Sequence, residues 1–195
     1  MAEIFLKAEK ITLSDKILAA TVLKLFPQRV TPNQLTIFRF FTVPFVLLLL
    51  FLGKYQWGAV LFAISAFTDA LDGAMARTRN QITEWGKIYD PLADKLLIVL
   101  TALFLIPQHL GFPIIFALLS TEMLLIGAAY YLKNKGRKDI QANIWGKIKM
   151  ILQSFGVGFL FLFAILNTPW LLAIAAMLLY ASILFAVISL VTYGI

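Results

Sequence analysis

The chain has 195 residues, of which 61% are hydrophobic and 14% are charged, and it contains no cysteine. Soluble globular domains are only about 45–50% apolar and about 25% charged. The composition therefore excludes an ordinary soluble domain and indicates a membrane protein. The lack of cysteine excludes disulfides, thiolate metal sites and cysteine nucleophiles. The net charge of +7 fits the lysine and arginine excess of cytoplasmic membrane loops better than nucleic-acid binding.

The first predicted segment covers residues 1–32, which are mixed in polarity. Five apolar residues recur there at helical spacing: Ile17, Leu18, Val22, Leu25 and Phe26. This pattern predicts an amphipathic helix that lies on the membrane surface, with its lysines toward anionic head groups. An ordinary surface helix is the alternative interpretation. Ser14 or Asp15 is placed to cap this helix, and Pro27 is placed to end it.

The rest of the chain consists of apolar runs separated by turn residues. A helix needs about 20 apolar residues to cross a hydrocarbon core about 30 Å thick. We expect membrane spans at residues 33–53, 57–77, 86–106, 111–132, 146–166 and 169–192. A break containing Pro107 and Pro113 is expected between the third and fourth spans. The sequence thus predicts an all-α membrane protein with six transmembrane helices, forming one catalytic domain over residues 33–195.

Lysine and arginine are concentrated on one side of these predicted spans. The N-terminal segment, the second-to-third connection and the fourth-to-fifth connection are all basic, whereas the first-to-second connection carries only Lys54. By the positive-inside rule, both termini and the even-numbered connections are expected to be cytoplasmic. We therefore expect a multi-pass protein of the cell membrane.

Four aspartates are placed where an apolar chain would not be expected to carry charge. Asp69 and Asp72 lie near the end of the second run, and Asp90 and Asp94 near the start of the third. Burying a carboxylate in a bilayer costs about 2.5–3.5 kcal/mol, so such residues normally face water, a partner or an ion. The spacings within the two pairs place each pair on one helix face, and a short connection brings the two faces together. Four hard oxygen donors predict a site for Mg²⁺, Mn²⁺ or Ca²⁺ and indicate phosphoryl chemistry.

The residues between the two pairs fit the same chemistry. Gly73 leaves room for a nucleotide or phosphate to approach the helix, and Arg77 offers a guanidinium fork to phosphate. Gly86 opens the facing helix at a similar depth. Tight packing of two helices is the alternative interpretation of both glycines.

Together these residues resemble one family signature, D-x2-D-G-x2-A-R-x8-G-x3-D-x3-D, at every specified position. It is the signature of the CDP-alcohol phosphotransferases. The resemblance implies a six-span homodimer whose site opens to the cytoplasm and holds divalent metal, Mg²⁺ or Mn²⁺, as two ions. It implies that Asp69, Asp72 and Asp90 bind metal, and that Asp94 is the general base and a second metal contact. Residues implied to bind CDP are Asp69, Asp72, Gly73, Ala76, Arg77 and Gly86.

Further segments extend the resemblance. Residues 31–36 with Arg39 are similar to the family's entry to the first span, so Asn33 and Thr36 are expected to reach the nucleotide; helix capping is the alternative for them. Residues 90–95 and 146–153 resemble segments of phosphatidylglycerophosphate synthases. The chain departs from those enzymes at Met150, where they carry threonine, and at Thr121, where they carry arginine.

The resemblance implies an integral-membrane enzyme of phospholipid synthesis. It would transfer the phosphatidyl group of CDP-diacylglycerol, or of a related CDP-lipid, to an alcohol and release CMP. Glycerol 3-phosphate is the favoured acceptor, while inositol phosphate, serine and other polar alcohols stay open. Candidate acceptor-binding residues are Glu122, Lys133, Lys135, Arg137, Lys147 and Lys149; cytoplasmic charge without a catalytic role is the alternative for the basic ones. A divalent-cation transporter is the alternative of another class, but it predicts acids spread along a path and leaves Gly73, Arg77 and Gly86 unexplained.

Overall fold

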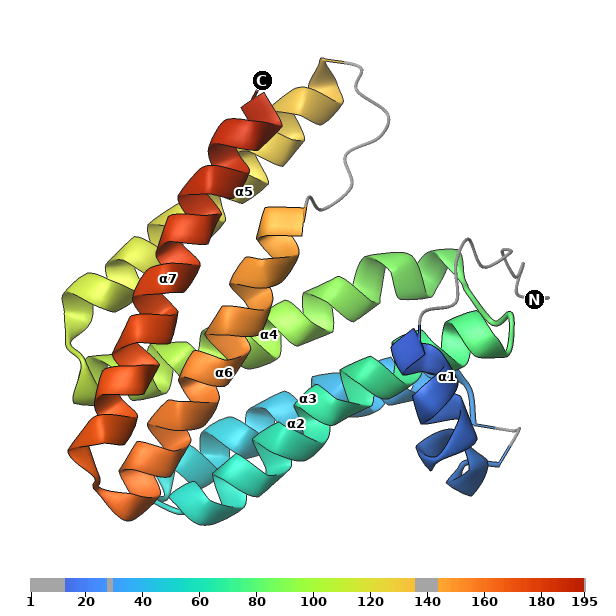
Figure 1. Cartoon of the computed structure of the whole chain (residues 1–195), viewed down its shortest axis with the longest axis horizontal. Helices are drawn as coiled ribbons and strands as arrows, with labels where there is room; N and C mark the ends of the chain where they lie inside the picture. Colours follow the sequence, from blue (N-terminus) through green and yellow to red (C-terminus); the bar gives the residue numbers. More distant parts are fainter. Residues whose placement is uncertain (1–12, 28–29, 136–143, 195) are drawn as a thin grey trace. The chain divides into compact units, whose positions relative to one another are not determined.

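The computed structural model describes residues 13–27, 30–135 and 144–194, and this part of the chain is all-helical. It begins with a short helix and a 3₁₀ turn, which are followed by long helices (Figure 1). The elements are α1 (Leu13–Ala20), η1 (Val22–Leu25), α2 (Pro32–Phe51), α3 (Tyr55–Thr78), α4 (Glu84–His109), α5 (Phe112–Asn134), α6 (Ile144–Leu166) and α7 (Pro169–Gly194).

Five of the described helices are long and apolar enough to cross a membrane: α2, α3, α5, α6 and α7. Many of their large apolar side chains, such as Phe41, Trp57 and Met177, are exposed at the surface of the protein. An apolar surface of this extent suits contact with lipid better than contact with water. The fold is therefore that of a helical, multi-pass membrane protein.

The helix α4 is the element that differs from the predicted set of spans. It has 26 residues, so its length is sufficient, but it is not one of the five apolar candidates. Its first half carries five charged residues, Glu84, Lys87, Asp90, Asp94 and Lys95, and only the second half is continuously apolar. The sixth span stays a prediction, and the charged half of α4 is the part that contributes to the candidate site.

The predicted helix boundaries agree with the observed ones to within three residues. The predicted break between Pro107 and Pro113 is present but begins three residues later than predicted, because α4 continues through Pro107 to His109. The chain turns at Gly111 instead, whose φ of 84° is the left-handed conformation that favours glycine. The N–H groups of Leu110 and Gly111 both donate to the carbonyl of Ile106, at 2.8 and 3.1 Å, and so close the end of the helix.

The chain divides into two compact units, Met1–Leu100 and Thr101–Ile195, with the boundary inside α4. In the described part of the first unit, α2 and α3 lie side by side and α1 packs against α3 (Figure 1). In the second unit, α7 packs against both α5 and α6. A Cβ on Gly156 of α6 would stand only 2.9 Å from Leu179 of α7, so this glycine permits a close helix crossing. A single catalytic domain over residues 33–195 stays a prediction.

The N-terminal segment packs on the first unit. Leu18, Val22 and Phe26 contact a buried cluster of Leu23, Leu35, Leu71, Ala74 and Met75. Ile17 remains exposed. Much of the apolar face that predicts membrane binding is therefore used for packing within the protein, and the interfacial placement stays a prediction. The helix already includes Ser14 and Asp15, so neither residue stands before it as a cap.

Candidate active site

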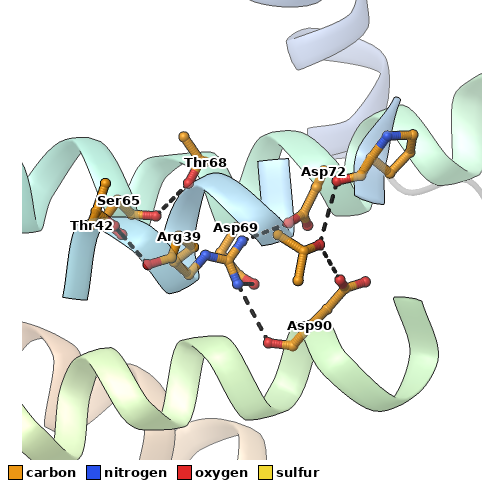
Figure 2. A network of polar contacts seen from close by, with 9 residues as sticks. Arg39, Thr42, Ser65, Thr68, Asp69, Asp72 and Asp90 are labelled. Atoms are coloured by element: carbon orange, nitrogen blue, oxygen red, sulfur yellow. Dashed lines mark hydrogen bonds and ion pairs between the residues drawn. The ribbon is translucent and has the colours of Figure 1, made fainter. Parts of the chain in front are cut away.

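A single arginine links three of the signature aspartates. Arg39 of α2 is completely buried, and its guanidinium forks between two aspartates of α3 (Figure 2). Nη1 donates to Asp69 Oδ1 at 2.7 Å, and Nη2 donates to Asp72 Oδ2 at 2.6 Å. Nη1 also reaches the backbone carbonyl of Asp90 in α4, at 3.4 Å. One side chain thus links three helices at the position of the signature aspartates.

The two aspartates of α3 share one helix face but differ in exposure. The Asp69 side chain is 42% exposed, whereas the Asp72 side chain is 3% exposed. A buried carboxylate needs a cation or hydrogen-bond donors to offset its loss of hydration, and Arg39 supplies both to Asp72. Asp69 therefore lies at the accessible side of the cluster, and Asp72 forms its buried floor.

The aspartates of α4 complete the cluster. The buried hydroxyl of Thr36 in α2 donates to Asp90 Oδ1. Asp94 follows one turn later in α4, so it lies on the same helix face as Asp90. Arg39 therefore joins both aspartates of α3 to the backbone of Asp90 in α4, as the antiparallel arrangement of the two helices predicts.

The start of α4 is held by a short chain of polar contacts. The Gly86 N–H donates to Thr83 Oγ1 at 3.0 Å, and Thr83 Oγ1 donates to Asn33 Oδ1 at 2.9 Å. A Cβ on Gly86 would stand 3.1 Å from Asp90 Oδ2 and from Thr83 Oγ1. Asn33 and Thr36 thus fix the position of α4 from α2. The capping contact of α2 belongs to Gln34, whose Oε1 accepts the Thr31 N–H at 3.1 Å.

Arg77 forms a separate ion pair at the end of α3. Its Nε and Nη2 donate to the two carboxylate oxygens of Asp15 in α1, at 2.8 and 2.7 Å. The guanidinium lies over Gly73, because a Cβ at that position would stand 3.2 Å from Nη2 and 3.3 Å from Nη1. Ala76, the remaining signature residue, is partly buried beside it. Gly73 therefore makes room for the side chain of Arg77.

In the second unit, two of the predicted acceptor residues form a buried ion pair. Lys149 of α6 donates to Glu122 Oε1 of α5, and Gln153 Nε2 donates to the same oxygen at 3.3 Å. Both charged side chains are about 6% exposed. Since an isolated charge at this depth is costly, each partner makes the burial of the other tolerable.

Of the other predicted acceptor residues, the structure describes the side chains of Lys147 and Lys135. Lys147 is exposed. Lys135 is also exposed, and its Nζ lies 4.7 Å from the centre of the Tyr131 ring. The side chain of Lys133 and all of Arg137 lie outside what the structure describes.

A family model described as CDP-alcohol phosphatidyltransferase matches residues 29–188. The chain belongs to the CDP-alcohol phosphatidyltransferase family. It is 30% identical over 179 residues to the CDP-diacylglycerol--glycerol-3-phosphate 3-phosphatidyltransferase of Bacillus subtilis, covering 81% of this chain and 90% of that one. It is 33% identical over 135 residues to the protein of the same name from Rickettsia typhi, covering 67% and 75%. The predicted family resemblance and the prediction of an enzyme are confirmed.

The match to this phosphatidyltransferase family makes a divalent ion the expected cofactor. The four aspartates offer only hard oxygen donors, which suit Mg²⁺ or Mn²⁺. Over residues 13–27, 30–135 and 144–194, however, no three acidic, histidine or cysteine residues converge closely enough to hold an ion. Asp69 and Asp72 converge on the guanidinium of Arg39 instead. The residue types therefore fit the metal, whereas the positive charge between Asp69 and Asp72 comes from Arg39.

Sequence reasoning assigned no role in the candidate site to two residues that pair with its charged side chains, Arg39 and Asp15. Arg39 was noted as part of the entry to the first span but was given no role, although an arginine inside an apolar run is itself a signal. Asp15 was considered only as a helix cap. It lies outside the residues matched by the family model, and no local pattern connects it to Arg77, which is 62 residues away.

Proposed function

We propose that this chain transfers the phosphatidyl group of CDP-diacylglycerol to glycerol 3-phosphate and releases CMP. The observation that carries the proposal is that the buried Arg39 links three signature aspartates, Asp69, Asp72 and Asp90, in a chain of this family. The names of the relatives support both the donor and the acceptor. A cation transporter does not explain why Gly73 and Gly86 make room for signature side chains.

The four aspartates have separate roles in this proposal. Asp69, Asp72 and Asp90 hold Mg²⁺ or Mn²⁺, with Asp94 as a further contact, and the metal neutralises charge on the pyrophosphate when it is bound. Asp94 accepts the proton of the acceptor hydroxyl. The hydroxyl oxygen then forms a bond to the β-phosphorus of the donor while the bond from that phosphorus to the CMP oxygen breaks.

The donor is proposed to approach the cluster from the side where Asp69 and Arg77 are exposed. These two side chains are 42% and 39% exposed, whereas Arg39 and Asp72 beneath them are buried. Arg77 binds a donor phosphate, and Gly73, Ala76 and Gly86 line the pocket. Asn33 and Thr36 contribute by holding α4 in place, which their contacts with Thr83 and Asp90 support.

The acceptor is proposed to bind through the basic residues of the second unit. Glycerol 3-phosphate carries a phosphate, and Lys133, Lys135, Arg137, Lys147 and Lys149 offer positive charge. Lys147 is exposed and suited to contact that phosphate directly. Lys149 is also assigned to the phosphate, and Glu122 holds its ammonium group in place. Inositol phosphate and serine are the alternatives within the same chemistry.

The proposed setting is the cell membrane. We infer six spans, with α4 as the additional one, both termini and the active site on the cytoplasmic side, and a homodimer. The distribution of lysine and arginine supports this orientation, and the family resemblance supports the dimer.

A release assay tests the function. Purified protein is given CDP-diacylglycerol, Mg²⁺ or Mn²⁺, and separately glycerol 3-phosphate, inositol phosphate or serine, and the CMP formed is measured. We expect glycerol 3-phosphate to give the highest rate, and chelation of the metal to abolish it. Absence of CMP release with every acceptor, together with metal flux into vesicles containing the protein, would favour the transporter.

A further inference from the structure

Asp15 is a deeply buried acidic group of the N-terminal segment, and it pairs with Arg77 of the signature. Its side chain is 2% exposed, and both of its oxygens accept hydrogen bonds from Arg77. A bidentate carboxylate–guanidinium pair fixes the plane of the guanidinium as well as its position. Arg77 is therefore held in one orientation by a residue of α1, which lies before the residues matched by the family model.

The pair uses one edge of the guanidinium and leaves another available. Asp15 accepts from Nε and Nη2, so the N–H groups of Nη1 and the second N–H of Nη2 point elsewhere. The Arg77 side chain is 39% exposed in spite of this pairing. Because Gly73 has no Cβ, the guanidinium of Arg77 can lie close against the helix at this position. The orientation of the accessible N–H groups of Arg77 is therefore fixed before a ligand binds.

We propose that Asp15 is a positioning residue for donor recognition, which holds the Nε and Nη2 edge of Arg77 so that the opposite edge receives a phosphate of the CDP-lipid. This inference rests on the proposed function, because it assigns the phosphate contact to Arg77. Pre-orientation reduces the ordering that the donor must otherwise impose on a long, flexible side chain. The N-terminal segment is thereby a part of the donor site as well as a covering for α3.

Arg79 offers a comparison, because it joins the N-terminal segment to α3 and is assigned no contact with the donor. Arg79, two residues after Arg77, donates to the carbonyls of Leu23, Phe26, Pro27 and Val30 at 3.0–3.4 Å. It holds the same N-terminal segment to the end of α3, and these four contacts within the described residues are all to backbone carbonyls. If Asp15 acts only as a second tether, loss of either contact will have the same consequences.

The test measures binding of CDP-diacylglycerol to the full chain in detergent with Mg²⁺, by calorimetry, beside steady-state kinetics for both substrates. Asp15→Asn keeps the shape but removes the charge. We expect it to weaken donor binding about tenfold and to raise the donor KM to a similar extent, with the KM for the acceptor unchanged. Asp15→Glu restores the charge and is expected to recover part of the affinity. Arg79→Gln is expected to lower the unfolding temperature while donor affinity changes less than twofold.

A double variant distinguishes a role of Asp15 in positioning Arg77 from a role in stabilising the protein. Arg77→Lys removes the guanidinium and with it the bidentate contact to Asp15. In this background, Asp15→Asn should have little further effect on donor affinity. Equal effects of Asp15→Asn and Arg79→Gln on donor affinity, or tighter donor binding by Asp15→Asn, would overturn the inference. If the wild-type chain itself binds no CDP-diacylglycerol, the proposed function fails, whereas unchanged binding by Asp15→Asn beside a binding wild type rejects the role of Asp15 alone.

Discussion

The guanidinium of Arg77 lies back over Gly73, four residues earlier in α3, with Nη2 only 3.2 Å from where a Cβ of Gly73 would stand. The same relationship recurs in α4, where a Cβ of Gly86 would stand 3.1 Å from Oδ2 of Asp90, again four residues later. Residues at this spacing lie one above the other on a helix face, and side chains point back toward the N-terminus. Both signature glycines therefore make space for a signature side chain of their own helix. Neither close helix–helix packing nor direct room for a nucleotide is needed to explain them.

Replacement of Gly73 by alanine is expected to impair donor recognition without harming the fold. The new methyl group displaces the guanidinium of Arg77, which is the movable end of a flexible side chain. Alanine also favours a helix interior over glycine by about 0.5–1 kcal/mol. We expect a donor KM raised about tenfold and an unfolding temperature equal to that of the wild type or higher.

Gly158→Ala is the matched control for this prediction. Gly158 also lies inside a long helix, α6, but a Cβ there would meet nothing within 4 Å. This variant should gain the same helix stabilisation and keep the wild-type donor KM. A Gly73→Ala enzyme with unaltered donor KM would show that the position of the guanidinium is not critical.

Replacement of Gly86 by alanine is expected to be more damaging than replacement of Gly73. Its Cβ would lie 3.1 Å from both Asp90 Oδ2 and Thr83 Oγ1 and 3.4 Å from Asn33 Oδ1, and these atoms belong to a connected set of contacts. Displacing Asp90 alters a carboxylate that we assign to the metal. We expect kcat to fall at least tenfold and the Mn²⁺ concentration for half-maximal activity to rise, as measured by a metal titration of CMP release. A variant with a wild-type metal titration would contradict this assignment.

The helices and the acidic pairs could be predicted from the sequence, whereas the partners of the charges could not. Runs of about 20 apolar residues locate the helices because chain length and bilayer thickness determine them. The spacing of Asp69 and Asp72 determines their common face. Which cation meets them depends on how α2 packs beside α3, and this is a tertiary property. The pairing of Arg39 and of Asp15 was missed for that reason, and Pro107 was misread because a proline close to a helix end need not terminate it.

Arg39 is expected to stabilise the protein most strongly when no metal is present. Arg39→Gln removes the cation from the buried Asp72, and breaking a buried pair from one side costs about 3–5 kcal/mol. We expect a lowered unfolding temperature in detergent with a chelator present. Added Mn²⁺ should raise the unfolding temperature of this variant more than that of the wild type, because the ion replaces the missing positive charge. If Mn²⁺ raises the unfolding temperature of both proteins equally, Arg39 and the metal do not act on the same carboxylates.

The division of roles among the aspartates predicts two distinct defects. Asp94→Asn removes the proposed base, so the rate of CMP release should fall about 10²–10⁴-fold while CDP-diacylglycerol binding is retained. Asp72→Asn removes a proposed metal ligand, so it should weaken binding of CDP-diacylglycerol in the presence of Mg²⁺. Calorimetry and a single-turnover assay on the two variants distinguish these defects. Normal turnover by Asp94→Asn would exclude it as the base.

The pair of Glu122 and Lys149 offers a test of the acceptor site that is independent of the aspartates. Lys149→Met leaves a buried carboxylate without its cation and should destabilise the protein by about 3–5 kcal/mol. The double variant Glu122→Gln with Lys149→Met removes both charges and should recover most of that loss.

If the pair serves only to join α5 to α6, the double variant will also recover its activity with glycerol 3-phosphate. We expect stability to return while the KM for glycerol 3-phosphate stays raised about tenfold, because a phosphate contact is lost with the lysine. Lys147→Met, at an exposed position of the same helix, should raise that KM without lowering the unfolding temperature.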